Sequence, residues 1–233
     1  MQDTSKFVSI IPIRSGSKGF PNKNIIPLKG IPLYKHSLFQ SQRIIPKTLI
    51  STDIEMVLKE RNQENIIVLR RPKQLCGDSI QMKEVLIDIF QKHEKDLSES
   101  IIILLQVTSP LRQDKDIKNA IKMYQTGKYS MIMSVTETDS SILKCGFVDD
   151  SKFINLKNEN YTFSNRQELP KIYKPNGAIY IFSTKDFMKE KNFPHNSIGA
   201  YFMPSEYSID IDTKQDLNLI EEMLSSNKIE YQN

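Results

Sequence analysis

The sequence predicts an α/β fold built on a doubly wound, largely parallel β-sheet. Apolar runs of strand length alternate with stretches of helical periodicity along most of the chain. The runs are continuous rather than alternating with polar residues, which indicates strands covered by helices on both faces. A length of 233 residues fits one domain over 1–233.

The expected strands and helices follow one another in order. The strands are expected at 8–13, 48–51, 66–69, 101–105, 131–135, 178–182 and 200–203. The helices are expected at 32–42, 55–62, 79–93, 114–125 and 213–224. The alternation fails at 140–175, which we interpret as an inserted subdomain. An insertion of this size predicts either a segment that pairs with another subunit or a lid.

Composition argues against several classes of protein. The formal net charge of +4 is mild, and the lysines are scattered among carboxylates, so no nucleic-acid partner is expected. No apolar run approaches membrane-spanning length, and the first six residues are polar, so neither a membrane segment nor a secretory signal is expected. Cys76 and Cys145 form no disulfide framework or metal-binding spacing, which favours the reducing cytoplasm.

A loop of small residues and cations follows the first expected strand. It contains Ser15, Gly16, Ser17 and Gly19, and Arg14 and Lys23 carry positive charge. Small residues let backbone N–H groups approach oxygen atoms, so the loop is typical of a phosphate-binding site. It matches neither the Walker nor the dinucleotide-binding glycine pattern. The alternative interpretation is a solvated basic turn.

Two aspartates near the end of the sequence are two residues apart. In an extended segment Asp210 and Asp212 face the same side, where they could hold Mg²⁺ together with substrate phosphates. The alternative is that Asp212 caps the following helix with Gln215, and that Asp210 is simply solvated.

Polar residues also follow two other expected strands. Residues 106–112 carry amide, hydroxyl and guanidinium groups that could bind a sugar or a base, although they could equally form an ordinary strand-to-helix connection. Arg70 and Arg71 could hold a phosphate or a base carbonyl, while Asp78 or Ser79 caps the next helix. The Asn176-Gly177 pair is typical of a turn.

Other catalytic chemistry has little support. His36, His93 and His195 belong to no zinc-binding pattern, and the chain has no nucleophile-elbow motif. Acyl transfer and zinc-dependent hydrolysis are therefore disfavoured.

Taken together, these segments resemble the acylneuraminate cytidylyltransferases, also called CMP-sialic acid synthetases. The matching segments, in order, are 14–19 with Pro21, Lys23 and Asn24; 51–53; Arg71 and Pro72 with Leu75 and Asp78; Gln106 with 108–112; 175–180; and 210–212 with Asp216 and Leu217. The resemblance covers essentially the whole chain.

The resemblance implies a Rossmann-like nucleotidyltransferase that transfers CMP from CTP to the anomeric hydroxyl of a nonulosonic acid and releases pyrophosphate. The implied CTP-binding residues are Arg14, Ser15, Gly16, Ser17, Lys23, Asn24, Arg71 and Asp78. The implied sugar-binding residues are Gln106, Ser109, Arg112, Lys144, Arg166, Asn176 and Tyr180. Asp210 and Asp212 would bind Mg²⁺, and these two with Arg14 and Lys23 would form the catalytic set.

The resemblance also implies a homodimer. Segment 140–175 looks like the family's dimerisation subdomain, which would bring Lys144 and Arg166 to the sugar carboxylate across the interface. Phe193-Pro194 stands where some sialic-acid enzymes have paired phenylalanines, so N-acetylneuraminic, legionaminic and pseudaminic acids all remain candidate acceptors. The alternatives are a CTP:KDO cytidylyltransferase and a non-catalytic nucleotide-sugar binder.

Overall fold

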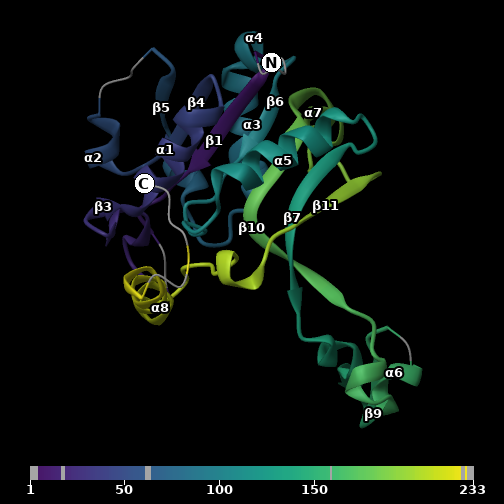
Figure 1. Ribbon diagram of the computed structural model, residues 1–233. Helices are drawn as coiled ribbons and strands as arrows, with labels where there is room; N and C mark the ends of the chain where they lie inside the picture. Colours follow the sequence, from purple (N-terminus) through teal and green to yellow (C-terminus); the bar gives the residue numbers. More distant parts are fainter. Residues whose placement is uncertain (1–4, 17–18, 61–63, 158, 227–228, 230–233) are drawn as a thin grey trace.

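The described part of the chain forms a mixed seven-stranded sheet (Figure 1). The computed structural model describes residues 5–16, 19–60, 64–157, 159–226 and 229. The strands of the sheet are β1 (Phe7–Pro12), β4 (Lys47–Thr52), β5 (Ile66–Arg70), β6 (Ile101–Leu104), β7 (Met131–Thr138), β10 (Ile172–Ser183) and β11 (Ile198–Phe202). Their order is β11-β7-β10-β6-β1-β4-β5, and β10 runs antiparallel to both of its neighbours. The largely parallel sheet is therefore confirmed.

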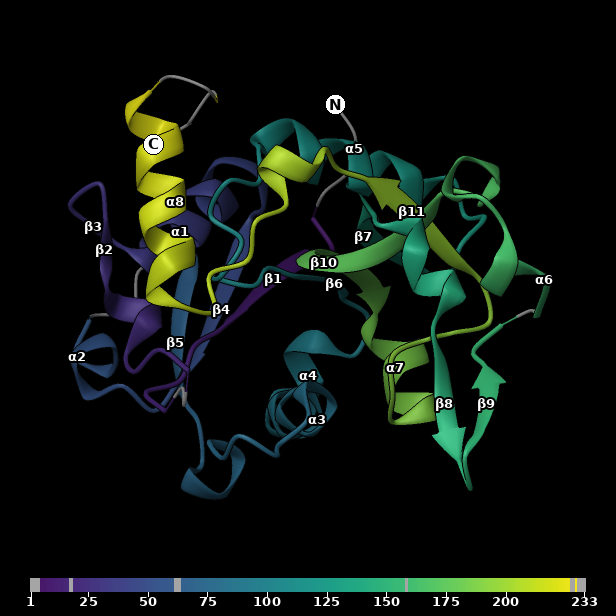
Figure 2. The same cartoon turned by 90° about the horizontal axis from the view of Figure 1, so that it is seen from below.

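Helices cover both faces of this sheet. The helices are α1 (Leu33–Ile44), α2 (Glu55–Leu58), α3 (Met82–Lys92), α4 (Glu94–Leu97), α5 (Asp114–Gln125), α6 (Glu159–Phe163), α7 (Thr184–Glu190) and α8 (Lys214–Ser225). Figure 2 shows α1 and α5 on one face and α3 and α4 on the other. None of the described helices has both the length and the apolarity that crossing a membrane requires.

Alternate strand residues supply two hydrophobic cores. Ile10 and Ile102 pack in one buried cluster with residues of α3, α4 and α7. Ile11 and Ile103, their neighbours along the same strands, pack in the other cluster with residues of α1, α5 and α8. Because successive strand residues point to opposite faces, a continuous apolar run is what a sheet between two helix layers requires.

The elements expected from the sequence are found, with a few differences. Helix α2 is shorter than expected, and residues 61 and 62 of the expected helix lie outside the described residues. Strand β10 begins at Ile172, six residues before the expected start at 178. Helix α7 was not expected, although Ser183 caps it by accepting a hydrogen bond from the backbone N–H of Asp186.

The cap of helix α8 differs from the expected Asp212–Gln215 pair. Thr213 accepts a hydrogen bond from the backbone N–H of Asp216, and the Asp216 carboxylate accepts one from the N–H of Thr213 at 2.7 Å. This reciprocal capping box satisfies helix N–H groups that would otherwise lack partners. The Asp212 carboxylate is therefore not used as a cap.

Strands β7 and β10 extend beyond the sheet and carry a small unit at their ends, which we call the projection (residues 139–171). Its described parts include a hairpin of β8 (Gly146–Asp149) and β9 (Lys152–Asn155), together with α6. Figure 1 shows this unit well away from the sheet. It lies within the expected insertion at 140–175, whose last residues belong to β10. The remaining short strands, β2 (Pro27–Leu28) and β3 (Ile31–Pro32), pair with each other near α1.

Arg112 is a buried structural centre rather than a sugar-binding residue. Its side chain donates hydrogen bonds to the carbonyl oxygen of Ala178 on β10 and to the amide oxygen of Gln40 on α1. It also donates to the carbonyl oxygen of Gln106 and the hydroxyl of Ser37. Burial lowers the pKa of Arg112 to about 10, with Asp116 and Asp114 opposing that shift, so the side chain stays charged at neutral pH.

Replacing Arg112 by Leu should destabilise the fold, because the acceptors on Gln40, Gln106 and Ala178 would be left buried without their donor. Each stranded buried acceptor costs about 1–3 kcal/mol, so with three of them we expect the free energy of unfolding in urea to fall by about 3 kcal/mol or more. Arg70→Leu is the matched control, because Arg70 forms an exposed ion pair with Glu55. The control should leave the urea midpoint nearly unchanged, and equal midpoints for the two variants would contradict the role given to Arg112.

Candidate active site

A cavity of about 570 Å³ lies where β1, β5 and β6 end. Ligands of doubly wound sheets bind at this carboxyl edge. Eight of the residues expected from the sequence to bind nucleotide, sugar or metal line the cavity: Arg14, Lys23, Asn24, Arg71, Asp78, Gln106, Asp210 and Asp212. The early cationic loop and the late aspartates therefore meet at one place.

The loop after β1 is held by hydrogen bonds from outside it. Asp53 accepts hydrogen bonds from the backbone N–H of Ser15 at 2.8 Å and from its hydroxyl at 2.6 Å. Asn24 is buried and donates to the carbonyl oxygen of Arg14. These contacts fix the start and the end of the loop, so Arg14 is held over the cavity.

The small residues of this loop have different surroundings. Ser15 and Gly16 are exposed and are not among the residues that line the cavity. A Cβ at Gly16 would meet nothing within 4 Å, whereas one at Gly19 would lie 3.3 Å from the carbonyl oxygen of Asp212. Ser17, expected to bind CTP, lies outside the described residues.

The two loop cations are paired with carboxylates of the same cavity. Arg14 forms an ion pair with Asp78 at 2.6 Å and donates to the carbonyl oxygen of Cys76. Lys23 donates at 2.8 Å to the carboxylate of Asp212 and at 2.8 Å to the carbonyl oxygen of Ile211. The site can therefore bind an anionic ligand by exchanging these carboxylates for the ligand's oxygens.

Arg71 is buried at the base of the cavity. Its guanidinium donates to the hydroxyl and to the carbonyl oxygen of Ser51, the last residue but one of β4. Burial lowers the pKa of Arg71. Held in this way, Arg71 presents a fixed cationic edge to the cavity.

Asp210 is the most unusual carboxylate of the site. Its Oδ1 atom is buried and has no hydrogen-bond partner among the described residues. Burial raises the pKa of Asp210, a hydrogen bond with Thr108 opposes the shift, and the nearby charge of Asp212 adds to it. A buried carboxylate oxygen without a partner beside a second carboxylate suits a divalent cation.

Two further cavities adjoin the first on the side of Tyr180. One, of about 660 Å³, is lined by Asn176, Gly177 and Tyr180 together with both site aspartates. The other, of about 350 Å³, is lined by Gln106, Tyr180, Phe193 and three methionines. Burial raises the pKa of Tyr180, and the charge of Asp210 adds to the shift.

Gly177 leaves room for the Gln106 side chain, which lines the first cavity and the cavity of about 350 Å³. Its φ is +76°, and a Cβ there would lie 2.9 Å from the amide oxygen of Gln106. The Asn176-Gly177 pair, which the sequence indicated as a turn, thus lies within β10 and lets the backbone approach Gln106 closely.

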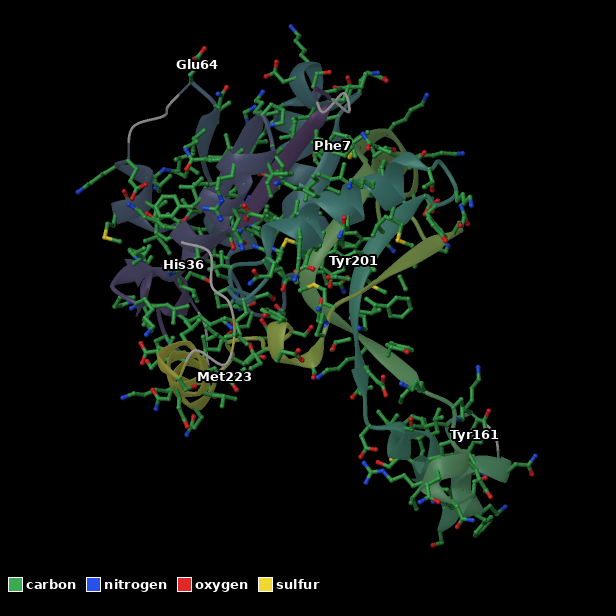
Figure 3. All side chains as sticks on the ribbon, in the orientation of Figure 1. Phe7, His36, Glu64, Tyr161, Tyr201 and Met223 are labelled. Carbon is green, nitrogen blue, oxygen red and sulfur yellow. The ribbon has the colours of Figure 1, made fainter. Side chains whose placement is uncertain are left out.

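Four of the expected sugar-binding residues do not line these three cavities. Ser109 is buried and donates to the carbonyl oxygen of Asn176, and Arg112 is buried beneath the loop after β6. Both therefore support the site from behind rather than touching a ligand. Lys144 and Arg166 belong to the projection, where Arg166 pairs with Asp139. Figure 3 shows this unit, marked by Tyr161, far from the body of the same chain.

Sequence reasoning gave no role to several residues of the site. Asp53 was noted only as part of a matching segment, yet its carboxylate holds Ser15. Met82, Met131 and Met133 line the cavity beside Tyr180. Their apolar character was the signal of a core position, and only the fold shows that they reach a cavity.

Comparison with known proteins places the chain in a family. A family model described as Cytidylyltransferase matches residues 8–233. The chain belongs to the cytidylyltransferase family. The resemblance seen in the sequence is therefore confirmed.

Curated relatives of this cytidylyltransferase act on different sugars, as their names state. The N-acylneuraminate cytidylyltransferase of Streptococcus agalactiae serotype V is 33% identical over 223 residues, which cover 91% of this chain and 51% of the relative. The CMP-N,N′-diacetyllegionaminic acid synthase of Legionella pneumophila is 28% identical over 96% of this chain and 98% of the relative. The chain thus spans about half the length of the first of these relatives.

Solved structures with low sequence identity share the fold. A CMP:2-keto-3-deoxy-manno-octonic acid synthetase complexed with CTP superposes with a TM-score of 0.70 at 15% identity, covering 95% of this chain and 99% of that one. A 4-diphosphocytidyl-2C-methyl-D-erythritol synthase from Anaerococcus prevotii superposes with a TM-score of 0.65 at 15% identity, covering 94% and 99%. The expected nucleotidyltransferase fold is therefore confirmed.

Replacing Asp210 by Asn should change how the stability of this cytidylyltransferase depends on pH. The pKa of Asp210 is raised in the fold, so the folded state keeps the proton to higher pH than the unfolded state does. The stability that Asp210 contributes is present below about pH 4 and is lost as pH rises through the folded pKa. Asp210→Asn should therefore gain stability relative to the wild type as pH rises above about 4 in urea titrations. A difference that does not vary with pH would contradict this.

Proposed function

We propose that this protein transfers CMP from CTP to the anomeric hydroxyl of a sialic-acid-like nonulosonic acid and releases pyrophosphate. The observation that carries the proposal is the meeting of Arg14, Lys23 and the two late aspartates in one cavity. In the reaction, the anomeric oxygen forms a bond to the α-phosphorus and loses its proton, while the bond from that phosphorus to the pyrophosphate oxygen breaks.

The residues of the cavity can bind and orient the nucleotide. Arg14 and Lys23 would exchange Asp78 and Asp212 for phosphate oxygens, and their charge would stabilise the anionic leaving group. Asn24 and Arg71 line the same cavity and would face the nucleoside, as the resemblance implies. Because little covalent chemistry is needed from the protein, alignment of the two substrates supplies much of the catalysis.

The site residues fit Mg²⁺. Asp210 offers a buried oxygen that has no partner among the described residues, and Asp212 lies beside it with an exposed carboxylate. No group of three or more His, Cys, Asp or Glu side chains in the described residues is arranged to hold a metal ion, so the other ligands would be phosphates and water. When bound, Mg²⁺ would neutralise charge that develops on the leaving pyrophosphate.

The acceptor would occupy the cavities beside Tyr180. Gln106 lines both the nucleotide cavity and the cavity of about 350 Å³, so a sugar there would lie next to the nucleotide. Names of the relatives favour a nine-carbon acid, since they include N-acylneuraminate and legionaminic acid enzymes. KDO remains the alternative acceptor. A non-catalytic binder would have no need of the paired aspartates.

A panel of acceptors tests this function. Pyrophosphate release from CTP and Mg²⁺ should occur with at least one nonulosonic acid and be much slower with KDO. Asp212→Asn should lower turnover about a thousandfold or more and weaken CTP binding only modestly, because the lost group acts mainly on the transition state. Asp96→Asn, an exposed aspartate of α4 away from the cavity, is the matched control. Turnover of KDO without any nonulosonic acid, or an active Asp212→Asn variant, would overturn the proposal.

We further propose that the protein is a homodimer formed through the projection. Large hydrophobic side chains are exposed there in unusual number: Ile142, Phe147, Val148, Phe153, Ile154, Leu156 and Phe163. Exposed apolar patches of this kind mark interaction sites. In such a dimer Lys144 and Arg166 would reach the sugar carboxylate in the partner's cavity, as the resemblance implies.

The proposed cytoplasmic location fits the state of the cysteines. Cys76 and Cys145 are both free thiols, as expected in a reducing compartment.

Val148→Asp should shift the protein towards a monomer in gel filtration. Val148 is 74% exposed on β8, and a charge buried without a partner in an interface is costly. Leu219→Asp is the control, because Leu219 is also exposed but lies on α8. A monomeric wild type, or an unchanged elution volume for Val148→Asp, would contradict the proposed interface.

A further inference from the structure

Asp53 lies between two of the loops that form the nucleotide cavity. It directly follows β4, which pairs in parallel with β1 on one side and with β5 on the other. Because parallel strands bring the segments after them to one edge, Asp53 stands between the loop after β1 and the loop after β5. It is not among the residues that line the cavity. Any effect of Asp53 on a bound nucleotide must therefore pass through another residue.

The two residues before Asp53 are hydrogen-bonded to the segments on both sides. The carbonyl oxygen of Ser51 accepts a hydrogen bond from the N–H of Ile13 at 2.9 Å. The carbonyl oxygen of Thr52 accepts one from the N–H of Arg71 at 2.7 Å. The backbone that carries Asp53 is therefore fixed relative to both loops.

The carboxylate of Asp53 holds the backbone next to Arg14. Its Oδ1 atom accepts a hydrogen bond from the N–H of Ser15 at 2.8 Å, and its Oδ2 atom accepts one from the Ser15 hydroxyl at 2.6 Å. Burial would raise the pKa of Asp53, but the hydrogen bonds from Ser15 outweigh that effect and lower it, so the carboxylate is charged at neutral pH. Hydrogen bonds to a charged acceptor are roughly twice as strong as those between neutral groups. Ser15 is thus anchored directly after Arg14.

The same carboxylate also reaches the residue that receives the Arg14 guanidinium. Burial raises the pKa of the Cys76 thiol, and the charge of Asp53 and a hydrogen bond between these two side chains add to the shift. The carbonyl oxygen of Cys76 accepts a hydrogen bond from Nη1 of Arg14 at 3.0 Å. Asp53 therefore holds Arg14 at both ends, through Ser15 beside its backbone and through Cys76 at its guanidinium.

The contact between Arg14 and Cys76 is of a kind that can remain when a ligand binds. Arg14 uses Nη2 for the ion pair with Asp78 and Nη1 for the carbonyl oxygen of Cys76. A phosphate oxygen that takes the place of Asp78 would leave the second contact intact. The guanidinium would then keep its direction while its charge passes to the ligand, and a group held in place beforehand costs less ordering on binding.

We propose that Asp53 is a positioning residue that holds Arg14 in place for the phosphates of the nucleotide. Asp53 touches no substrate itself. Its effect falls on the two phosphates that leave as pyrophosphate rather than on the nucleoside. This inference rests on the proposed function and adds a residue to the same site.

The affinities for CTP and for CMP test the role of Asp53. Both are measured by titration calorimetry in the presence of Mg²⁺, and CMP lacks the two phosphates that Arg14 would bind. Asp53→Ala should weaken CTP binding about thirtyfold, as the loss of hydrogen bonds to a charged group allows, and CMP binding about threefold or less. Asp53→Asn keeps the size of the side chain and one carbonyl acceptor, so it should weaken CTP binding only about fivefold.

Two further variants assign the effect to Arg14. In an Arg14→Ala background, Asp53→Ala should weaken CTP binding further by about threefold or less, because the side chain that Asp53 positions is already gone. Glu55→Ala is the matched control, since this carboxylate lies two residues further along and forms an exposed ion pair with Arg70. The control should leave both affinities unchanged. A full thirtyfold loss in the Arg14→Ala background would overturn the role given to Asp53.

The outcomes separate this inference from the function on which it rests. Equal weakening of CTP and CMP binding by Asp53→Ala would overturn the positioning role and leave the proposed function standing. If Asp53→Ala proves unfolded in urea titrations, Asp53→Asn decides, and an unchanged CTP affinity in that variant would overturn the role. A wild type that binds CTP but releases no pyrophosphate with any acceptor would overturn the proposed function alone. A wild type that binds no CTP would overturn both.

Discussion

The burial of Ile211 holds the candidate site together. This side chain is fully buried in the core that includes residues of α1 and α8, and its backbone N–H donates at 2.8 Å to the carbonyl oxygen of Thr108. Its neighbours on both sides, Asp210 and Asp212, line the cavity. Because alternate residues of an extended chain face opposite sides, anchoring Ile211 in the core turns both carboxylates towards the cavity.

The same segment also joins parts of the chain that are distant in sequence. The Lys23 side chain, 188 residues before Ile211, donates to that residue's carbonyl oxygen. The loop after β1 and the approach to α8 thereby become the two walls of one cavity. An ion pair between Lys23 and Asp212 joins these walls, and Arg14 pairs with Asp78 beyond β5, so these two cations of the cavity are matched by carboxylates.

Much of this arrangement could be predicted from the sequence, because it depends on local periodicity. Continuous apolar runs identified the strands, and parallel strands bring the segments that follow them to one edge. The two-residue spacing of Asp210 and Asp212 indicated a shared side. The interpretation of Arg112 as a sugar ligand was wrong. Its side chain donates instead to Gln40 and Ala178, which lie 72 and 66 residues away in sequence, so no local pattern indicated these contacts. A sequence pattern shows that a cation follows a strand, but not towards which face it turns.

The long strand β10 connects the site with the projection. It carries Asn176, Gly177 and Tyr180 at the cavities and reaches to Ile172 beside the projection, and its register with β7 shifts between Pro175 and Tyr180. A bulge of this kind is where a strand bends most easily. If the part of β10 next to the projection tilts, the strand therefore either bends at this bulge or moves the residues around Tyr180. If two subunits associate through their projections, β10 connects the cavity of each subunit to the interface. A change in β10 caused by ligand binding in one subunit could then reach the other, so binding at the two sites need not be independent.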